Sequence, residues 1–419
     1  MTGRLRPLEV APFEREGRAA VRLRDPLCIS PAASEARGRL LEPAEWEFAS
    51  RMGMGADVDE LAATVGLAKD DAHALARALG DELLLDDAAS RAAIESASAE
   101  FAALDARPPT GAGREYEGDA IDLRIRLAGQ VANDWDMPAP PDLSGVWAPA
   151  SGLHQRAPLF ARSYAAVRHH AATFQRVLLL GSMPAPLGPP LVPLAKDLGT
   201  PFGRLAHDAQ AVACLPASSA NAELVHRGSR VLERHALFLR LLLPRLPVVP
   251  VLVSGAARQQ RGEPAGPGEL EDSVQSLRKV LALPGRALIV VACDLAELPG
   301  EMSPSPPPPA GRMLHGAGAG GRDATGWIVT GTVGERLRAE DSRLVDALTR
   351  TEPEQVWSLS RASDNALRRA NAPLAWIAAR LFSELRAEPD GAPVRGSLLG
   401  YQQSSERTGL VSGASIVFH

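Results

Sequence analysis

Residues 287–294 read Ala-Leu-Ile-Val-Val-Ala-Cys-Asp. Two similar apolar runs precede this stretch, Arg-Val-Leu-Leu-Leu-Gly at 176–181 and Val-Val-Pro-Val-Leu-Val at 248–253. Strands that are apolar throughout, instead of alternating with polar residues, are typical of parallel sheets covered by helices on both faces. Helical patterns at 229–243 and 270–283 separate these runs. The sequence therefore predicts a layered α/β domain with a mostly parallel sheet.

Further elements extend this pattern along the second half of the chain. Four consecutive prolines within the Gly-rich stretch 303–323 predict a long flexible loop. The remaining expected elements are a strand end at 146–149, helices at 157–172, 343–348 and 364–385, and closing strands at 397–401 and 413–418.

The composition excludes several classes of protein. The chain has 419 residues, 45% of them apolar, and a net charge of −5, so no basic field attracts nucleic acid. The three cysteines, Cys28, Cys214 and Cys293, are far apart, which argues against a disulfide framework or a structural zinc site. No signal-peptide pattern opens the chain, and no apolar run is long enough to span a bilayer. We expect a soluble, cytoplasmic protein.

Residues 1–100 are expected to form a separate module. An extended segment at 20–24 precedes helices that start near residues 43 and 57, and Asp70-Asp71 is expected to cap a third helix. Leu83-Leu84-Leu85 suggests a short strand, which completes the outline of a winged helix. A helical connector at 88–105 would join this module to the domain formed by 101–419.

The third helix of this module carries Asp70, Asp71, Asp81 and Glu82 against Lys69 and Arg77, so it would repel phosphate. Binding to nucleic acid is therefore not expected. The outline and the Leu23-Arg24-Asp25-Pro26 turn are similar to PqqD-like winged-helix modules, which bind peptides or partner proteins.

A series of motifs from residue 107 onward resembles the Memo family, also called AmmeMemoRadiSam system protein B, in its order along the chain. That resemblance implies a fold like that of class III extradiol dioxygenases. The matching segments are Arg107–Tyr116, Pro149–Gly152, Leu180–Pro184, Thr200–Gly203 with Asp208, Arg234–Phe238, Ala292–Glu297, Ala370–Leu374 and Tyr401–Ser404.

The positions that resemble the family's metal ligands carry other residues here. Where the family has two histidines and a late cysteine, this sequence has Ala150, Pro184 and Ala370. None of these side chains can donate a lone pair to iron or copper, the metals that such ligands suit. Glu297 replaces a further histidine, and Arg234 or Phe238 stands where the family has a glutamate. We therefore expect no metal cofactor, with a relocated iron or copper site as the alternative.

Several polar residues remain near the expected edge of the sheet. His235, Asp294 and Glu297 are candidates for acid–base chemistry, because paired carboxylates with a histidine can move protons if they converge. Each also has a structural interpretation, as a buried histidine, a turn cap or a solvated carboxylate, and a hard-metal site formed by Asp208, Asp294 and Glu297 is a further alternative. The other candidates for lining a cleft are Ser151, Gly152, His154, Ser182, Asp208 and Cys293.

Two classes of function remain open, with a third that is weaker. The first is a diverged Memo-like binding or accessory protein without catalysis, whose partner would be a radical SAM enzyme or an AMMECR-type protein, as the resemblance implies. The second is an enzyme, either a dioxygenase-like metal-dependent oxidoreductase with relocated ligands or a hydrolase. The third is a transcription factor, which the acidic helix disfavours.

Overall fold

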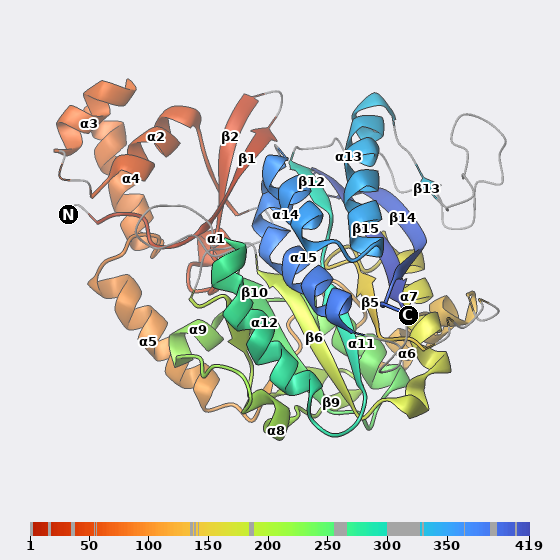
Figure 1. Cartoon of the computed structure of the whole chain (residues 1–419). Helices are drawn as coiled ribbons and strands as arrows, with labels where there is room; N and C mark the ends of the chain where they lie inside the picture. The colour runs from red at the N-terminus through yellow and green to blue at the C-terminus, as the bar shows by residue number, and fades with distance from the viewer. Residues whose placement is uncertain are drawn as a thin grey trace.

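The computed structural model is a layered α/β structure with a smaller module at its N-terminus (Figure 1). The residues that the structure describes are 3–15, 18–34, 38–53, 55, 57–134, 137, 140, 142–183, 188–254, 266–299, 327–328, 331–363, 365–385, 392–406 and 409–419. The expected loop at 303–323 and Pro184 lie outside these residues.

Four parallel strands form the centre of the main sheet, in the order β5 (Gly145–Ala148), β11 (Ala287–Ala292), β6 (Arg176–Met183) and β10 (Val248–Ser254). Nearly every residue in them is buried, as expected for strands with helices on both sides. This confirms the three apolar runs as the core of the sheet.

The flanking pairings are mostly antiparallel, so the complete sheet is mixed. On one side β15 (Gly409–Phe418) runs antiparallel to β5, and β14 (Gly396–Glu406) and β12 (Ala296–Pro299) both pair with β15. On the other side β7 (Leu191–Pro193) runs antiparallel to β10. Beyond β14, the short β13 (Trp327–Ile328) is parallel to it.

Two layers of helices cover the sheet, because alternate side chains of each strand point to opposite faces. Leu178 and Leu180 pack in one apolar core, whereas Val177 and Leu179 pack in the other. The first core contains α12 (Pro267–Leu281), α13 (Gly331–Thr349), α14 (Pro353–Ala362) and α15 (Ala366–Glu384), and the second contains α6 (Ala120–Ala132), α7 (Ala157–His169) and α11 (Val231–Leu242).

The N-terminal module has its own apolar core and a three-stranded antiparallel sheet. The sheet contains β1 (Glu9–Arg15), β2 (Arg18–Arg24) and β3 (Arg39–Leu41), and the helices are α2 (Pro43–Arg51), α3 (Val58–Val65) and α4 (Lys69–Asp81). The connecting helix α5 (Ala88–Ala102) then leads to the main domain. The prediction that this module is a winged helix stays a prediction.

Two local expectations for this module were wrong. Leu83–Leu85 is not a strand: Leu83 has a φ of 59°, and the only bridge in that stretch joins Leu85 to Leu5. The Leu83 and Leu84 N–H groups donate to Gly80 and Leu79, so these residues close the C-terminal turn of α4 instead of pairing with a strand. Asp70 and Asp71 do not cap α4, because the N-cap residue is Ala68. The two aspartates lie in the first turn, where their negative charges interact favourably with the helix dipole.

Two contacts among the described residues show how the module is held against the main domain. Leu27, which follows the buried Arg6–Asp25 ion pair, packs into the core that contains α7 and α11. Farther along the interface, Arg22 of β2 forms an ion pair with Glu297 of β12. Among the described residues, no helix is both long and apolar enough to cross a membrane.

Gly145 tests the packing at the centre of the sheet. A Cβ atom there would lie 2.5 Å from the Ile289 carbonyl oxygen and 2.6 Å from the Phe382 ring. We expect Gly145→Ala to lower the free energy of unfolding by about 3 kcal/mol, measured by urea denaturation. The control is Gly129→Ala in α6, where nothing lies within 4 Å. It should raise stability by about 0.5–1 kcal/mol, and equal losses in both variants would contradict this description of the core.

Candidate functional site

The carboxyl ends of the central strands meet at one edge of the sheet, and most of the candidate residues lie there. Ala292 of β11 is level with Ala148 of β5 and with Gly181 of β6. The residues that follow these positions, Ala150 and Asp294 among them, therefore come together. This is the edge at which open α/β sheets bind their ligands.

Asp294 is the centre of a buried polar network at this edge. Its Oδ1 accepts hydrogen bonds from the Ala150 backbone N–H at 2.9 Å and from Arg156 Nη1 at 2.6 Å. Its Oδ2 accepts from Ser151 Oγ at 2.7 Å and from Arg156 Nη2 at 3.5 Å. Arg156 Nη2 also donates to Ser151 Oγ. Both oxygens of the carboxylate thus have two donors each.

Arg156 lies in the turn before α7, and its side chain is fully buried. It reaches Asp294 because Arg156 N–H donates to Gly152 O, which folds residues 152–156 into a tight turn. Gly152 has a φ of 67°, a conformation that favours glycine. Arg156 is not among the residues predicted from the sequence. An arginine beside the apolar face of a helix can indicate a buried ion pair, because arginine is rarely buried unless it is paired.

Arg234 is the second arginine at this edge. It lies in the first half of α11 and donates from Nη1 to the Ala150 carbonyl oxygen. Its other nitrogens donate to Glu115, which also accepts from Arg230. The Ala150 backbone is therefore held at both of its polar groups. Its N–H donates to Asp294, and its C=O accepts from Arg234.

His235 is buried beneath this network, with both ring nitrogens hydrogen-bonded. Its Nε2 lies 3.0 Å from the Pro149 carbonyl oxygen, which can only accept, so Nε2 carries the proton. Its Nδ1 then accepts from the Tyr164 hydroxyl at 2.8 Å. Burial lowers the pKa of His235 to about 4. The neutral ring has no free lone pair for a metal ion or a substrate proton.

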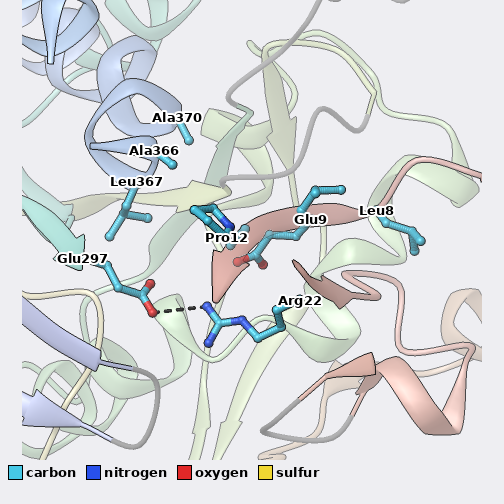
Figure 2. Close-up of a pocket in the computed structure, with 10 residues that line it drawn as sticks. Leu8, Glu9, Pro12, Arg22, Glu297, Ala366, Leu367 and Ala370 are labelled. Carbon is cyan, nitrogen blue, oxygen red and sulfur yellow. Dashed lines mark hydrogen bonds and ion pairs between the residues drawn. The ribbon is translucent and has the colours of Figure 1, made fainter. Parts of the chain in front are cut away.

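Glu297 lies on β12 at the interface with the N-terminal module. Its carboxylate accepts from Arg22 at 3.2 Å (Figure 2). Its backbone is held by Asn365, the residue before α15. Ala370 lies one helical turn into α15, on the same side as Ala366 (Figure 2). The carboxylates of Glu297 and Asp294 therefore each pair with a different arginine.

Asp208 lies at the opposite edge of the sheet. It caps α8 (Ala209–Val212) and accepts from Arg176, the first residue of β6. Its backbone N–H donates to Val248, the first residue of β10. The full length of a strand, about 20 Å for six residues, separates this edge from the one that holds Asp294. The expected trio of Asp208, Asp294 and Glu297 therefore does not form a site.

The remaining candidates are spread between the core and the surface. Cys293 is buried, and burial raises the pKa of its thiol, so it is a small core residue and not a nucleophile. Ser182 is buried in β6, close to Asp294 in register, and His154 is exposed on the surface. Pro184 lies outside the described residues. Within the part of the chain that the structure describes, no three His, Cys, Asp or Glu residues are grouped as metal ligands.

A second buried network fixes the segment that begins at residue 107, and sequence reasoning missed it too. Glu233 accepts hydrogen bonds from Arg107, from the Thr110 and Gly111 backbone N–H groups and from the Tyr116 hydroxyl. The Arg107 guanidinium is the main favourable charge that keeps the pKa of Glu233 below its usual value despite burial. This network ties the start of the main domain to α11.

Comparison with known proteins agrees with the motif order. A family model described as Memo-like protein matches residues 107–416, about three quarters of the chain. No curated protein matches the sequence.

The Asp294–Arg156 pair yields a stability prediction. Asp294→Asn leaves the buried guanidinium without its counter-charge and should lower the free energy of unfolding by about 3–5 kcal/mol. The control is Asp346→Asn, which removes one partner of the exposed Arg350–Asp346 pair and should cost less than about 1 kcal/mol. Urea denaturation measures both, and similar losses in the two variants would refute the network as drawn.

The buried histidines predict a pH dependence. The folded state keeps His235 neutral with a pKa near 4, and it lowers the pKa of buried His226 to about 3. Unfolded imidazole takes up a proton near pH 6.5. The stabilisation that comes from keeping these two histidines neutral is therefore fully present above about pH 6.5. It is lost as the pH falls toward their folded pKa values of about 4 and about 3.

Between pH 7 and pH 5 each histidine should cost about 2 kcal/mol of unfolding free energy. His235→Gln should reduce the total loss by that amount, whereas His154→Gln, at an exposed position, should leave it unchanged. A wild-type pH dependence in the His235 variant would show that its ring is not held neutral.

Proposed function

Because this chain belongs to the Memo-like protein family, we propose that it is a diverged member whose cleft works without the family's metal ion, as a binding or accessory protein. The observation that supports this most is the Arg156 guanidinium, which takes both oxygens of Asp294 at the carboxyl edge of the sheet. The carboxylate nearest to the expected metal position is thereby neutralised by a cation that the chain itself supplies.

The donors at this edge do not fit a metal ion. The methyl groups of Ala150 and Ala370 offer no lone pairs, and His235 uses both ring nitrogens within the core. Glu297, where the family has a histidine, pairs with Arg22. A transition-metal site generally needs three or four protein ligands in a defined geometry, and these residues supply none that is free.

The local charge also opposes a metal ion. Arg156 and Arg234 both contact the Ala150–Ser151 backbone or side chains, so two guanidinium groups flank the position of the family's histidine. At an effective dielectric constant near 20, a unit charge 4 Å from a second like charge is repelled by about 4 kcal/mol. A divalent ion at that distance would meet about twice that repulsion from each guanidinium, and the two nearby carboxylates, Asp294 and Glu115, are already paired with these arginines.

The enzyme alternatives find less support. A hydrolase that used Asp294, Glu297 and His235 would need a free base within hydrogen-bond reach of a nucleophile. Each of these groups instead has its own structural partner, and the hydrogen bonds of the described residues link none of the three directly to another. A metal-dependent oxidoreductase would need ligands from residues outside the described ranges.

A protein partner fits the arrangement of the N-terminal module. Leu27 and the Arg22–Glu297 pair hold the module against the main domain, so a partner that binds the module would lie next to the main domain. A radical SAM enzyme or an AMMECR-type protein is the partner that the family resemblance suggests. The acidic first turn of α4 disfavours nucleic acid as the occupant of this surface.

Metal content tests this proposal. Untagged protein purified without oxygen should contain less than about 0.1 equivalents of iron, copper, zinc or manganese by elemental mass spectrometry, because no free ligand set is available. The same measurement after incubation with each metal and gel filtration should give the same result. A stoichiometric metal that stays bound through gel filtration would contradict the proposal and favour the oxidoreductase.

A further inference from the structure

A pocket of about 290 Å³ lies where the N-terminal module meets the start of α15 (Figure 2). Its walls are apolar: residues 8 and 10–12 form one side, and Ala366, Leu367 and Ala370 form the other. Three charged residues also line it, Glu9, Arg22 and Glu297. This volume is at the lower limit of small-molecule sites, so the pocket has room for a ligand of modest size.

Arg22 lines this pocket, and two of its three guanidinium nitrogens lack hydrogen-bond partners among the described residues. Its side chain is 1% exposed, and its contact with Glu297 at 3.2 Å is long for a charge-assisted hydrogen bond. Its Nε and Nη1 atoms are buried without any hydrogen-bond partner among the described residues. Its guanidinium stacks over the Phe13 ring at 5.5 Å, which satisfies none of the N–H groups. Burial lowers the pKa of Arg22 from its usual value.

The start of α15 adds further donors on the facing wall. Asn365 caps the helix by accepting from the Arg368 backbone N–H. The N–H groups at the first helical positions, Ala366 and Leu367, have no partner within the helix, as at any helix start. The 19-residue helix also places the positive end of its dipole at this wall.

The acceptors already present do not satisfy these donors. Glu9 pairs with Arg24 at 3.4 Å and so is already engaged beside the pocket. Glu297 gives Arg22 a single contact through one oxygen. The pocket thus has largely apolar walls, and two guanidinium nitrogens of Arg22 beside it still lack an acceptor.

We infer that this pocket binds a small carboxylate that carries a short branched aliphatic chain. The carboxylate takes the place of Glu297 on Arg22 and lies before the first turn of α15, and the chain packs between Leu8 and Leu367. An amide would present one acceptor of partial charge, whereas a carboxylate can accept two hydrogen bonds from a guanidinium. The inference rests on the binding role proposed above and gives that role a ligand class.

The test is a titration of the full chain with 4-methylpentanoate and, separately, with 4-methylpentanamide, followed by calorimetry. The acid should bind, and the amide should bind at least about tenfold more weakly, because it lacks the charge that Arg22 pairs with. Equal affinities, or no binding of the acid to folded protein, would overturn the inference.

Three variants locate the site. Arg22→Met should weaken binding of the acid by about tenfold or more, whereas Arg39→Met, on the neighbouring strand β3 and paired with Glu82, should change it by less than about twofold. Equal effects of the two would overturn the assignment. Glu297→Gln should strengthen binding of the acid, since it removes the competing carboxylate. If Arg22→Met does not fold, this gain decides the question, and unchanged or weaker binding refutes the inference.

Metal content measured on the same samples keeps the two proposals separate. Metal-free protein that fails to bind the acid would contradict the inferred carboxylate ligand without contradicting the proposed metal-free binding role. Protein that binds the acid and also retains metal would contradict the proposed role alone.

Discussion

The buried ion pair between Arg156 and Asp294 is the interaction on which this edge of the sheet depends. A charge inside a protein is tolerated only when its partner and its remaining hydrogen bonds are all supplied. Here the Ala150 N–H and the Ser151 hydroxyl supply what Arg156 leaves open. The pair therefore fixes the end of β5, the end of β11 and the turn before α7 in one arrangement.

The same pair supports the proposal that the family's scaffold works here without a metal ion. The motif order agrees with the family match over residues 107–416, and the positive φ of Gly152 shapes the turn before α7. At this edge an arginine stands close to each of the two carboxylates: Arg156 against Asp294 and Arg22 against Glu297. Arg22 belongs to the N-terminal module, so the module contributes a charged side chain to this edge of the main sheet.

Much of the fold could be predicted because burial on both faces leaves a plain signature. The runs at 176–181, 248–253 and 287–292 are apolar throughout, and each is a central strand. The pairing of β14 and β15 was not determined by such a signal, since apolar strands can join a sheet in either direction. The strand predicted at Leu83–Leu85 was wrong. An apolar run of three residues does not reveal that its first residue has a positive φ, as Leu83 does.

The site was harder to predict, for a reason of distance along the chain. Asp294 and Arg156 are 138 residues apart, and Arg22 and Glu297 are 275 apart, so no local pattern links them. Asp208 follows a glycine turn just as a cleft residue would, yet it lies at the amino ends of the strands. The position of a residue in a motif predicts which strand or helix it adjoins. Only the pairing register of the strands shows at which edge of the sheet the residue lies.

Anomalous X-ray diffraction from crystals soaked in Mn²⁺ and in Zn²⁺ tests the central claim most directly, because it locates any bound ion. The account predicts no anomalous peak within about 3 Å of Asp294 or Glu297, with the Arg156 guanidinium seen against the Asp294 carboxylate. A peak at metal-ligand distance from either carboxylate, with Arg156 turned away, would show that the guanidinium does not take the place of the ion.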